Sequence, residues 1–326
     1  MSGAGRRTSS AAARDEGAPG TSRTVAAWLL PLLFALAVGL GVFGDDYVLE
    51  IGFRLLLLLT LAEAWNLMAG YGGLVSLGTA SFFGVGAYVL AGLVNHADLP
   101  LALALPAGGV AAALLAVLVS PAVFRLRGLY FTVGTLALAE ALRLFMINFN
   151  GFGGATGLFL AQDPPGLRAL YGIALSLLLL ATGVMTLATR SRFSILLRAV
   201  RDDEDAAAQI GVRAFRVKLA AFVVASFLTG VAGALQGLKL GAIEPYGSFG
   251  MAWTITVLAI VVIGGQGLRA GPLAGALFIV GVGELLADWP ALHLAVTGVI
   301  LIVVIRFAPQ GLVGLALRLW AKVRHG

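Results

Sequence analysis

Apolar runs of about 20 residues recur along this 326-residue chain, and they constrain its fold more than any other feature. A helix of that length crosses the roughly 30 Å of hydrocarbon in a bilayer. Hydrophobic residues make up 60% of the sequence and charged residues 12%, against about half and about a quarter in soluble domains. Because no water reaches the hydrocarbon, a spanning backbone must satisfy its own hydrogen bonds, as helices do. The sequence therefore predicts an all-α, polytopic integral membrane protein.

Ten apolar segments predict about ten transmembrane helices. Two of them, 250–265 and 272–287, are short and are separated by GGQGLRAG, so they either tilt across the membrane or form broken half-helices. We expect a transmembrane domain over 25–310, a disordered cytoplasmic tail over 1–24 and a basic cytoplasmic tail over 311–326. The ten segments are 25–43, 48–69, 73–94, 101–123, 129–148, 169–188, 219–238, 250–265, 272–287 and 291–307.

Basic residues are distributed unevenly between the two sides that this topology defines. With the N-terminus inside the cell and the segments alternating, 18 of the 22 lysines and arginines fall inside, and only Arg168 and Lys239 fall outside. Cytoplasmic loops of membrane proteins carry such an excess. The bias favours an even number of spans with both termini cytoplasmic. The net charge of +6 then reflects topology and contact with membrane lipid, and no nucleic-acid partner is expected.

Residues 190–218 form the largest polar interruption of the apolar pattern, with seven basic and four acidic residues, and we expect a cytoplasmic loop there. Asp202 or Asp203 can cap a helix, the acids that follow suit its positive end, and three alanines favour its continuation. Gly211 favours its end. We predict a short helix that fits a groove of a soluble partner, the alternative being an amphipathic connector on the lipid surface. The expected membrane-edge anchors are Arg190, Arg192, Arg213, Arg216 and Lys218.

Motifs for catalysis or cofactor binding do not stand out in the sequence. The chain has no cysteine and its three histidines are scattered, so no metal site is expected. No lysine follows a glycine, as a phosphate-binding loop requires, so ATP-driven work would need another chain. The carboxylates of 202–205 could hold Mg²⁺ in an intramembrane transferase, but the second acidic cluster needed, Glu284 with Asp288, is expected on the opposite side. We expect no enzyme activity and no cofactor.

Ionisable side chains inside apolar segments are costly and therefore mark candidates for function. Glu50 and Arg54 are four residues apart, and Glu140 and Arg143 are three apart, so each pair can neutralise itself on one helix face. Glu63 has no local partner and could pair with another helix. Of these residues, Glu140 is the candidate for lining a substrate pathway.

Small and hydroxyl-bearing residues concentrate in the stretch 74–92. Close helix packing explains such a pattern, and so does a locally unwound segment beside a transport pathway, where exposed backbone groups are tolerated. Under the second interpretation Ser76 and Ser81 line the pathway. The glycine-rich stretch 264–276 has the same two interpretations.

Several stretches over roughly residues 50–315 are more specific together, in their order, than any of them is alone. They are GYGGLVSLGTASFFGVGAYVLAG, LRGLYFTVGTLALAEALRLFMINFNGFGGATGL, RSRFSILLRAVRDDEDAAAQIGVRAFRVKLAAFVVASFLTGVAGAL, and GGQGLRAGPLAGALF with APQGLVG. In this order they resemble the permease subunits of ATP-binding-cassette importers for branched-chain and other hydrophobic amino acids.

The resemblance implies a multi-pass protein of the bacterial plasma (inner) membrane that works by alternating access. Its partners would be a sister permease subunit, two cytoplasmic ATPase subunits and an extracytoplasmic substrate-binding protein. The alternatives are an importer of the same type for urea or short amides, or an ion-coupled secondary transporter that uses Glu140 or Glu63. Residues matching the family's coupling loop, and so the expected ATPase contacts, are Arg201, Asp202, Asp203, Glu204, Ala206, Ala207 and Gly211.

The sequence departs from the family pattern at two places. It has Gln209 with the acidic run DDED at 202–205, and it has FGGATG where many members have a Thr-Gly-Gly run. The second departure lies in the longest outer connection, residues 148–168, which either contacts an outer partner or only joins two helices. It leaves the outer contact and the exact substrate open.

Overall fold

The computed structural model describes residues 34–287 without a gap and a few positions beyond them, namely 289, 296, 298–299, 302–303, 306 and 311–316. The expectations for the tail 1–24, for the start of the first apolar segment, for Asp288 and for most of 291–307 lie outside the described residues. Of the expected tail 311–326, residues 311–316 are described and are helical.

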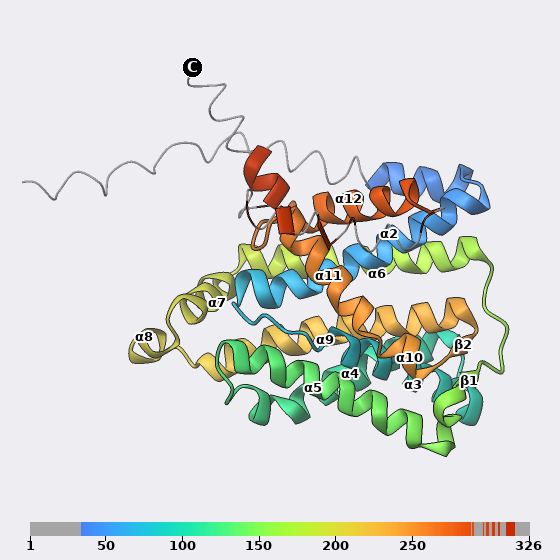
Figure 1. Cartoon of the computed structure of the whole chain (residues 1–326), viewed down its shortest axis with the longest axis horizontal. Helices are drawn as coiled ribbons and strands as arrows, with labels where there is room; N and C mark the ends of the chain where they lie inside the picture. Colours follow the sequence, from blue (N-terminus) through green and yellow to red (C-terminus); the bar gives the residue numbers. More distant parts are fainter. Residues whose placement is uncertain are drawn as a thin grey trace, which may run out of the picture.

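Helices make up nearly all of the regular structure in the described part of the chain (Figure 1). The longer ones are α2 (Asp46–Trp65), α3 (Thr79–Ala97), α4 (Leu101–Val123), α5 (Leu129–Asn148), α6 (Leu167–Arg190), α7 (Arg192–Asp202), α9 (Ala214–Leu240), α11 (Met251–Gly264) and α12 (Gly271–Leu285). The shorter elements are the π-helix η1 (Asn66–Tyr71), the 3₁₀ turns η2 (Asn150–Phe152) and η3 (Gly154–Thr156), α8 (Glu204–Gln209), α10 (Pro245–Ser248), β1 (Leu158–Phe159) and β2 (Ala242–Ile243).

Six helical stretches of the described residues are long and apolar enough to cross a membrane. They are α3, α4, α5, α6, α9 and the combined stretch Pro245–Gly264. Two further apolar helices, Phe34–Phe43 and α12, are shorter. The 20-residue α2 is equally long but carries Glu50, Arg54 and Glu63 among its charged residues. The prediction of an all-helical, multi-pass membrane protein is confirmed.

Connections between the helices lie at two opposite ends of the bundle. At one end, called the β end here, β1 pairs antiparallel with β2, and the Asn95 side chain donates to the carbonyl oxygen of Phe159 at 2.7 Å. At the other, the α8 end, Arg127 reaches Asp205. Figure 1 shows α7 and α8 projecting from the end opposite to β1 and β2. These contacts agree with the predicted alternation of the connections.

Small residues allow α3 and α9 to pack closely at the centre of the bundle. A Cβ atom built on Gly86 would lie 1.9 Å from the carbonyl oxygen of Gly230, and one built on Gly233 would lie 2.0 Å from that of Phe83. In a membrane, where no hydrophobic effect drives helices together, such close approach supplies the packing energy. The packing interpretation therefore holds for the helical part of 74–92.

The unwound interpretation holds for the residues just before α3. The predicted span 73–94 begins its helix only at Thr79, and residues 73–78 are not helical. Neighbouring side chains satisfy part of this backbone, because Thr135 Oγ1 accepts from the N–H of Leu77 at 3.0 Å. Trp65 also donates from its indole nitrogen to the carbonyl oxygen of Ser76 at 2.8 Å. Irregular backbone at membrane depth requires such partners.

The two short predicted segments become α11 and α12, which form a tight hairpin. A Cβ atom on Gly264 would lie 1.8 Å from the carbonyl oxygen of Gly271, so the glycines of 264–276 serve close packing. The break in this region comes earlier, at Phe249 and Gly250, where α10 ends and α11 begins.

Candidate functional site

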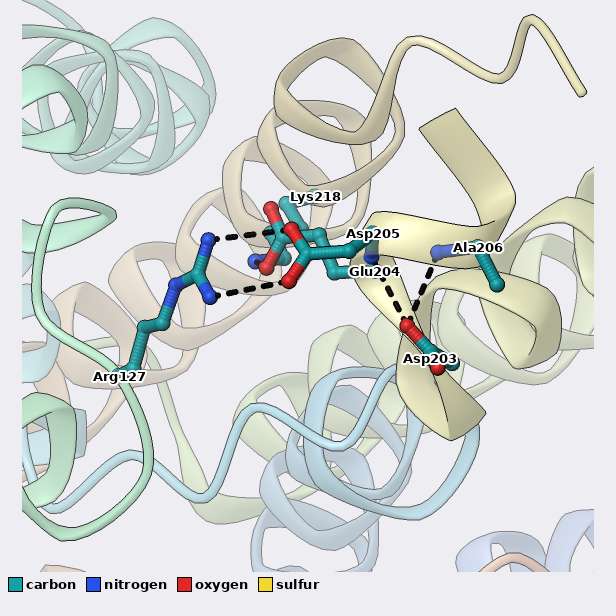
Figure 2. Close-up of polar contacts among 6 residues, drawn as sticks. All are labelled: Arg127, Asp203, Glu204, Asp205, Ala206 and Lys218. Atoms are coloured by element: carbon teal, nitrogen blue, oxygen red, sulfur yellow. Dashed lines mark hydrogen bonds and ion pairs between the residues drawn. The ribbon is translucent and has the colours of Figure 1, made fainter. Parts of the chain in front are cut away.

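The predicted cytosolic helix is present as α8 and is capped as expected. Asp203 Oδ1 accepts hydrogen bonds from the backbone N–H groups of Asp205 at 3.0 Å and Ala206 at 2.9 Å (Figure 2). Gly211 lies just past the helix with a φ of +85°, a left-handed conformation that glycine adopts without steric cost. Both the cap and the stop are therefore confirmed. With six residues, α8 is the short helix that the sequence predicts.

A helix that the sequence analysis missed, α7, precedes α8. Its 11 residues connect α6 to α8, and Leu197 and Val200 on it are buried. The pattern of its apolar residues, Phe193, Leu196, Leu197 and Val200, repeats at three- to four-residue intervals and could have indicated an amphipathic helix.

Two ion pairs join α8 to α9 and to the connection between α4 and α5 (Figure 2). Glu204 pairs with Lys218 of α9, and Asp205 pairs at 3.3 Å with Arg127, in the connection before α5. The hydrogen bond with Asp205 raises the pKa of Arg127. The prediction that Lys218 is a membrane-edge anchor was wrong, because its side chain is 11% exposed and engages α8.

The acidic cluster does not converge on a common point. Asp203 caps the helix and the carboxylate of Asp202 pairs with Arg201 at 2.8 Å. Glu204 and Asp205 each face their own cation. Metal coordination needs several carboxylates directed at one position. Among the described residues, no group of three or more His, Asp or Glu side chains could hold a metal ion.

The alanines of α8 divide between an inner and an outer face. Ala207 is 3% exposed and packs in a cluster that includes Leu67, Leu197 and Val217. Ala206 is exposed, and Ile210 after the helix is 79% exposed. Ala207 therefore packs α8 against the rest of the chain. The exposed outer face is formed by Asp205, Ala206, Ala208, Gln209 and Ile210. The sequence analysis did not select Ile210, although an isoleucine in a polar turn is a usable signal.

Arg201 links this region to the interior. Its Nη1 donates to the carbonyl oxygen of Gly70 at 3.0 Å, in the π-helical stretch η1, and its aliphatic stem lies against Gly73. Each π-helical turn leaves backbone groups out of the regular α pattern, and such turns frequently occur at functional sites.

Asn66, at the start of η1, fixes the connection between α11 and α12. Its side chain accepts from the N–H of Gly267 at 2.8 Å and donates to the carbonyl oxygen of Leu268 at 3.1 Å. Gln266 adds a bond to the carbonyl oxygen of Ala69 at 3.0 Å. The stretch η1 is therefore held from two sides, by α7 and by residues 265–270.

A partly open cavity of about 260 Å³ lies between the unwound segment, α3, α5 and the α10–α11 break. Glu140 and Arg143 line it, and they are joined by a hydrogen bond of 2.9 Å from Arg143 Nε to Glu140 Oε2. Ser76 and Ser81 are fully buried and are not lining residues. The Ser76 hydroxyl accepts from the N–H of Gly78, which places it behind the wall, in the unwound segment.

Other ionisable residues of the spans have partners on distant helices. Glu50 pairs with Lys239, so the prediction of a Glu50–Arg54 pair was wrong. Glu63 accepts a hydrogen bond from Thr182 of α6 at 3.0 Å, which confirms the expected partner on another helix. Glu284 accepts from the hydroxyl of Tyr47. These contacts are long-range, and sequence spacing does not reveal them.

The apolar helices, with a cavity between them and the helices α7 and α8 at one end, are the features of a multi-pass membrane protein. The chain belongs to the family of branched-chain amino acid transport system permease components, whose family model matches residues 47–305. This match confirms the resemblance seen in the sequence.

Relatives of known name agree with this assignment. The high-affinity branched-chain amino acid transport system permease protein LivM of Escherichia coli K12 is 28% identical, over 91% of this chain and 77% of its own length. The protein of the same name from Salmonella typhimurium LT2 is 30% identical, over 76% of this chain and 65% of its own length. The xylose transport system permease protein XylH of Escherichia coli K12 is 36% identical over 104 residues, 31% of this chain and 26% of its own. No solved structure gives a significant match.

Proposed function

We propose that this chain is the membrane-spanning permease subunit of an ATP-binding-cassette importer for branched-chain or related small amino acids, in the plasma (inner) membrane of a bacterium. Family membership and the similarity to LivM proteins support the transport role and the substrate class. The sequence offers no phosphate-binding loop in which ATP could be bound. ATP hydrolysis would therefore take place on two separate cytoplasmic subunits, and this chain would perform no covalent chemistry.

The proposed topology has about ten spans with both termini in the cytoplasm. The excess of basic residues favours this orientation, and it places the α8 end inside and the β end outside. The extracytoplasmic binding protein would then dock at the β end, where residues 148–168 and the paired strands β1 and β2 lie together.

The observation that carries the proposal is the way α8 is held. The helix is capped, packs inward through Ala207 and is paired with α9 and with the connection before α5. It presents an exposed outer face at the end of the bundle. A rigid helix with small residues on one face can insert into a groove of a soluble protein. The residues we assign to ATPase coupling are Arg201, Asp202, Asp203, Glu204, Ala206, Ala207 and Gly211, with Ile210 added to the outer face.

A continuous set of contacts leads from α8 to the cavity. Arg201, at the end of α7 next to α8, bonds to η1. The stretch η1 continues into the unwound residues 73–78, and this segment bonds to Thr135 of α5 and, through Leu77, to Thr254 of α11. Displacement of α8 by an ATPase would move these elements, open the cavity alternately to each side and pass substrate by Glu140. Ser76 and Ser81 would act within the moving segment.

The sister permease is proposed to face α5. Only Phe131, Thr135 and Ala139 of this helix are buried in the chain, and Glu140 lies on it with half of its side chain exposed. A charged side chain at that depth is costly in lipid. A second permease with a water-filled pathway between the two subunits would remove this cost.

Uptake of radiolabelled leucine into proteoliposomes tests the proposal. The chain would be reconstituted with its sister permease, ATPases and binding protein. We expect saturable uptake that requires ATP and the binding protein, and that excess urea or acetamide does not inhibit. Uptake driven by a proton gradient without ATP would instead indicate the secondary transporter, and inhibition by urea or acetamide would indicate the amide importer.

A further inference from the structure

The cavity beside α5 has an unusual distribution of charge. One wall carries Glu140 and Arg143, one turn apart, and Arg143 also lies over the ring of Tyr246 with 5.2 Å from Cζ to the ring centre. The wall therefore presents one negative and one positive group side by side, with no net charge.

The remaining walls are largely apolar. They include Leu77, Leu136, Phe249 and Met251. Thr254 also lines the cavity, but its hydroxyl already accepts from the N–H of Ala80 at 3.2 Å and contacts the carbonyl oxygen of Leu77 at 3.4 Å. The cavity thus combines one dipolar wall with apolar surroundings.

The paired charges of Glu140 and Arg143 indicate which class of ligand the cavity can bind. A ligand with a net charge would pair with one of the two ionised side chains and leave the other without its partner, whereas a ligand that carries both charges pairs with both. A sugar would bring several hydroxyl groups into walls that offer few partners, although buried polar groups require hydrogen bonds. A zwitterion with an apolar side chain fits both the charged wall and the apolar walls. Its two charges replace the Glu140–Arg143 pair by two ion pairs, one with each side chain.

We propose that Glu140 and Arg143 form a binding site inside the permease for a zwitterionic amino acid, with Glu140 binding the α-ammonium group and Arg143 the α-carboxylate. The apolar side chain of the ligand faces Phe249 and Met251, and a cavity of about 260 Å³ is on the scale of one amino acid. This inference rests on the proposed function and adds that the permease itself recognises both charges of its substrate.

Binding of tritiated leucine to the purified permease–ATPase complex, without the binding protein, tests this site. We expect saturable binding by the wild-type complex and a loss of about ten- to a hundredfold in affinity in Glu140→Gln and in Arg143→Gln, the range expected for charge-assisted hydrogen bonds. The two variants should also differ in which leucine analogue competes best with tritiated leucine. Glu140→Gln should favour isocaproate, which lacks the ammonium group, and Arg143→Gln should favour leucinamide, which lacks the carboxylate.

A purely structural pair would behave differently. Loss of a stabilising contact changes thermal stability but does not move ligand preference in opposite directions. The double variant Glu140→Gln/Arg143→Gln leaves no unpaired charge and should fold, yet lose leucine binding. Glu63→Gln, which changes a carboxylate that bonds to Thr182 outside this cavity, is the matched control and should bind leucine as the wild type does.

The outcomes separate this inference from the proposed function. Absent leucine binding by the wild type, wild-type affinity in the double variant, or unchanged competition in both single variants would each overturn the site. If the fully reconstituted wild-type transporter nevertheless imports leucine with ATP, only the site is wrong. If that transporter imports no amino acid, the proposed function is wrong as well.

Discussion

Arg201 of α7 donates a hydrogen bond of 3.0 Å to the carbonyl oxygen of Gly70 in the π-helical stretch η1. This bond directly joins α7, which precedes α8, to η1, and η1 leads into the unwound residues 73–78 at the cavity. It joins residues 131 positions apart in the sequence, so the link depends on the tertiary fold and not on local structure.

Replacing Arg201 by methionine should uncouple transport from ATP hydrolysis. Methionine keeps an apolar stem against Gly73 but removes the donor. A hydrogen bond from a charged group contributes about 1.5–3 kcal/mol, so we expect leucine transported per ATP hydrolysed to fall about tenfold. The matched control is Arg192→Met, which removes the same charge from an exposed position of the same helix. A transport-to-ATP ratio equal to wild type in Arg201→Met would refute the role of this link.

Phenylalanine at two adjacent alanines of α8 should have opposite consequences. Ala207 is buried against Leu197 and Val217, so Ala207→Phe overpacks the seat of α8 by about 1–3 kcal/mol and should lower the melting temperature of the purified permease. Ala206 is exposed, so Ala206→Phe should leave the melting temperature unchanged and reduce copurification of the ATPase subunits. The reverse pattern would show that the two faces of α8 are wrongly assigned.

Alanine at Gly233 should destabilise the bundle. The new Cβ would lie 2.0 Å from the carbonyl oxygen of Phe83, which forces α3 and α9 apart. Alanine favours a helix over glycine by about 1 kcal/mol, but overpacking of about 1–3 kcal/mol or more outweighs that gain. We expect less monodisperse protein in size-exclusion chromatography and a lower melting temperature. Gly183→Ala, where no atom lies within 4 Å of the new Cβ, is the control and should be neutral or slightly stabilising.

Cysteine labelling should establish the orientation. The chain has no cysteine of its own, and Phe159 and Ile210 are 78% and 79% exposed at opposite ends of the bundle. A membrane-impermeant maleimide should label Phe159→Cys in intact cells and Ile210→Cys only after permeabilisation. Coexpressed ATPase subunits should then protect Ile210→Cys. Labelling of Ile210→Cys in intact cells would reverse the proposed topology.

Local chemistry made part of this structure predictable. The cap at Asp203 and the stop at Gly211 depend on a few neighbouring residues. The spans follow from apolar runs long enough to cross the bilayer, and that length can be read without knowing the fold. The Glu140–Arg143 pair also followed from spacing, because residues three apart share a helix face.

Tertiary contacts account for what the sequence did not reveal. Glu50 has Arg54 one turn away but pairs with Lys239, since the fold brings α9 beside α2. The sequence position of Lys218 is typical of an interfacial anchor, but in the fold α8 lies beside it and Glu204 of α8 pairs with it. The π-helical stretch at Asn66–Tyr71 has no composition signal of its own, and the bond from the N–H of Gly267 to its first residue, Asn66, depends on the tertiary fold.

The two ion pairs of α8 lead to helices that are buried to very different extents within this chain. Through Lys218 it holds α9, which has 16 buried residues and backbone-to-backbone contact with α3. Through Arg127 it holds the start of α5, which has three buried residues. A displacement of α5 therefore disrupts less of this subunit's own packing than a displacement of α9. We therefore expect α9 to serve as a fulcrum and α5 as the moving arm, so that a small tilt of α8 at one membrane surface becomes a larger movement of the cavity wall.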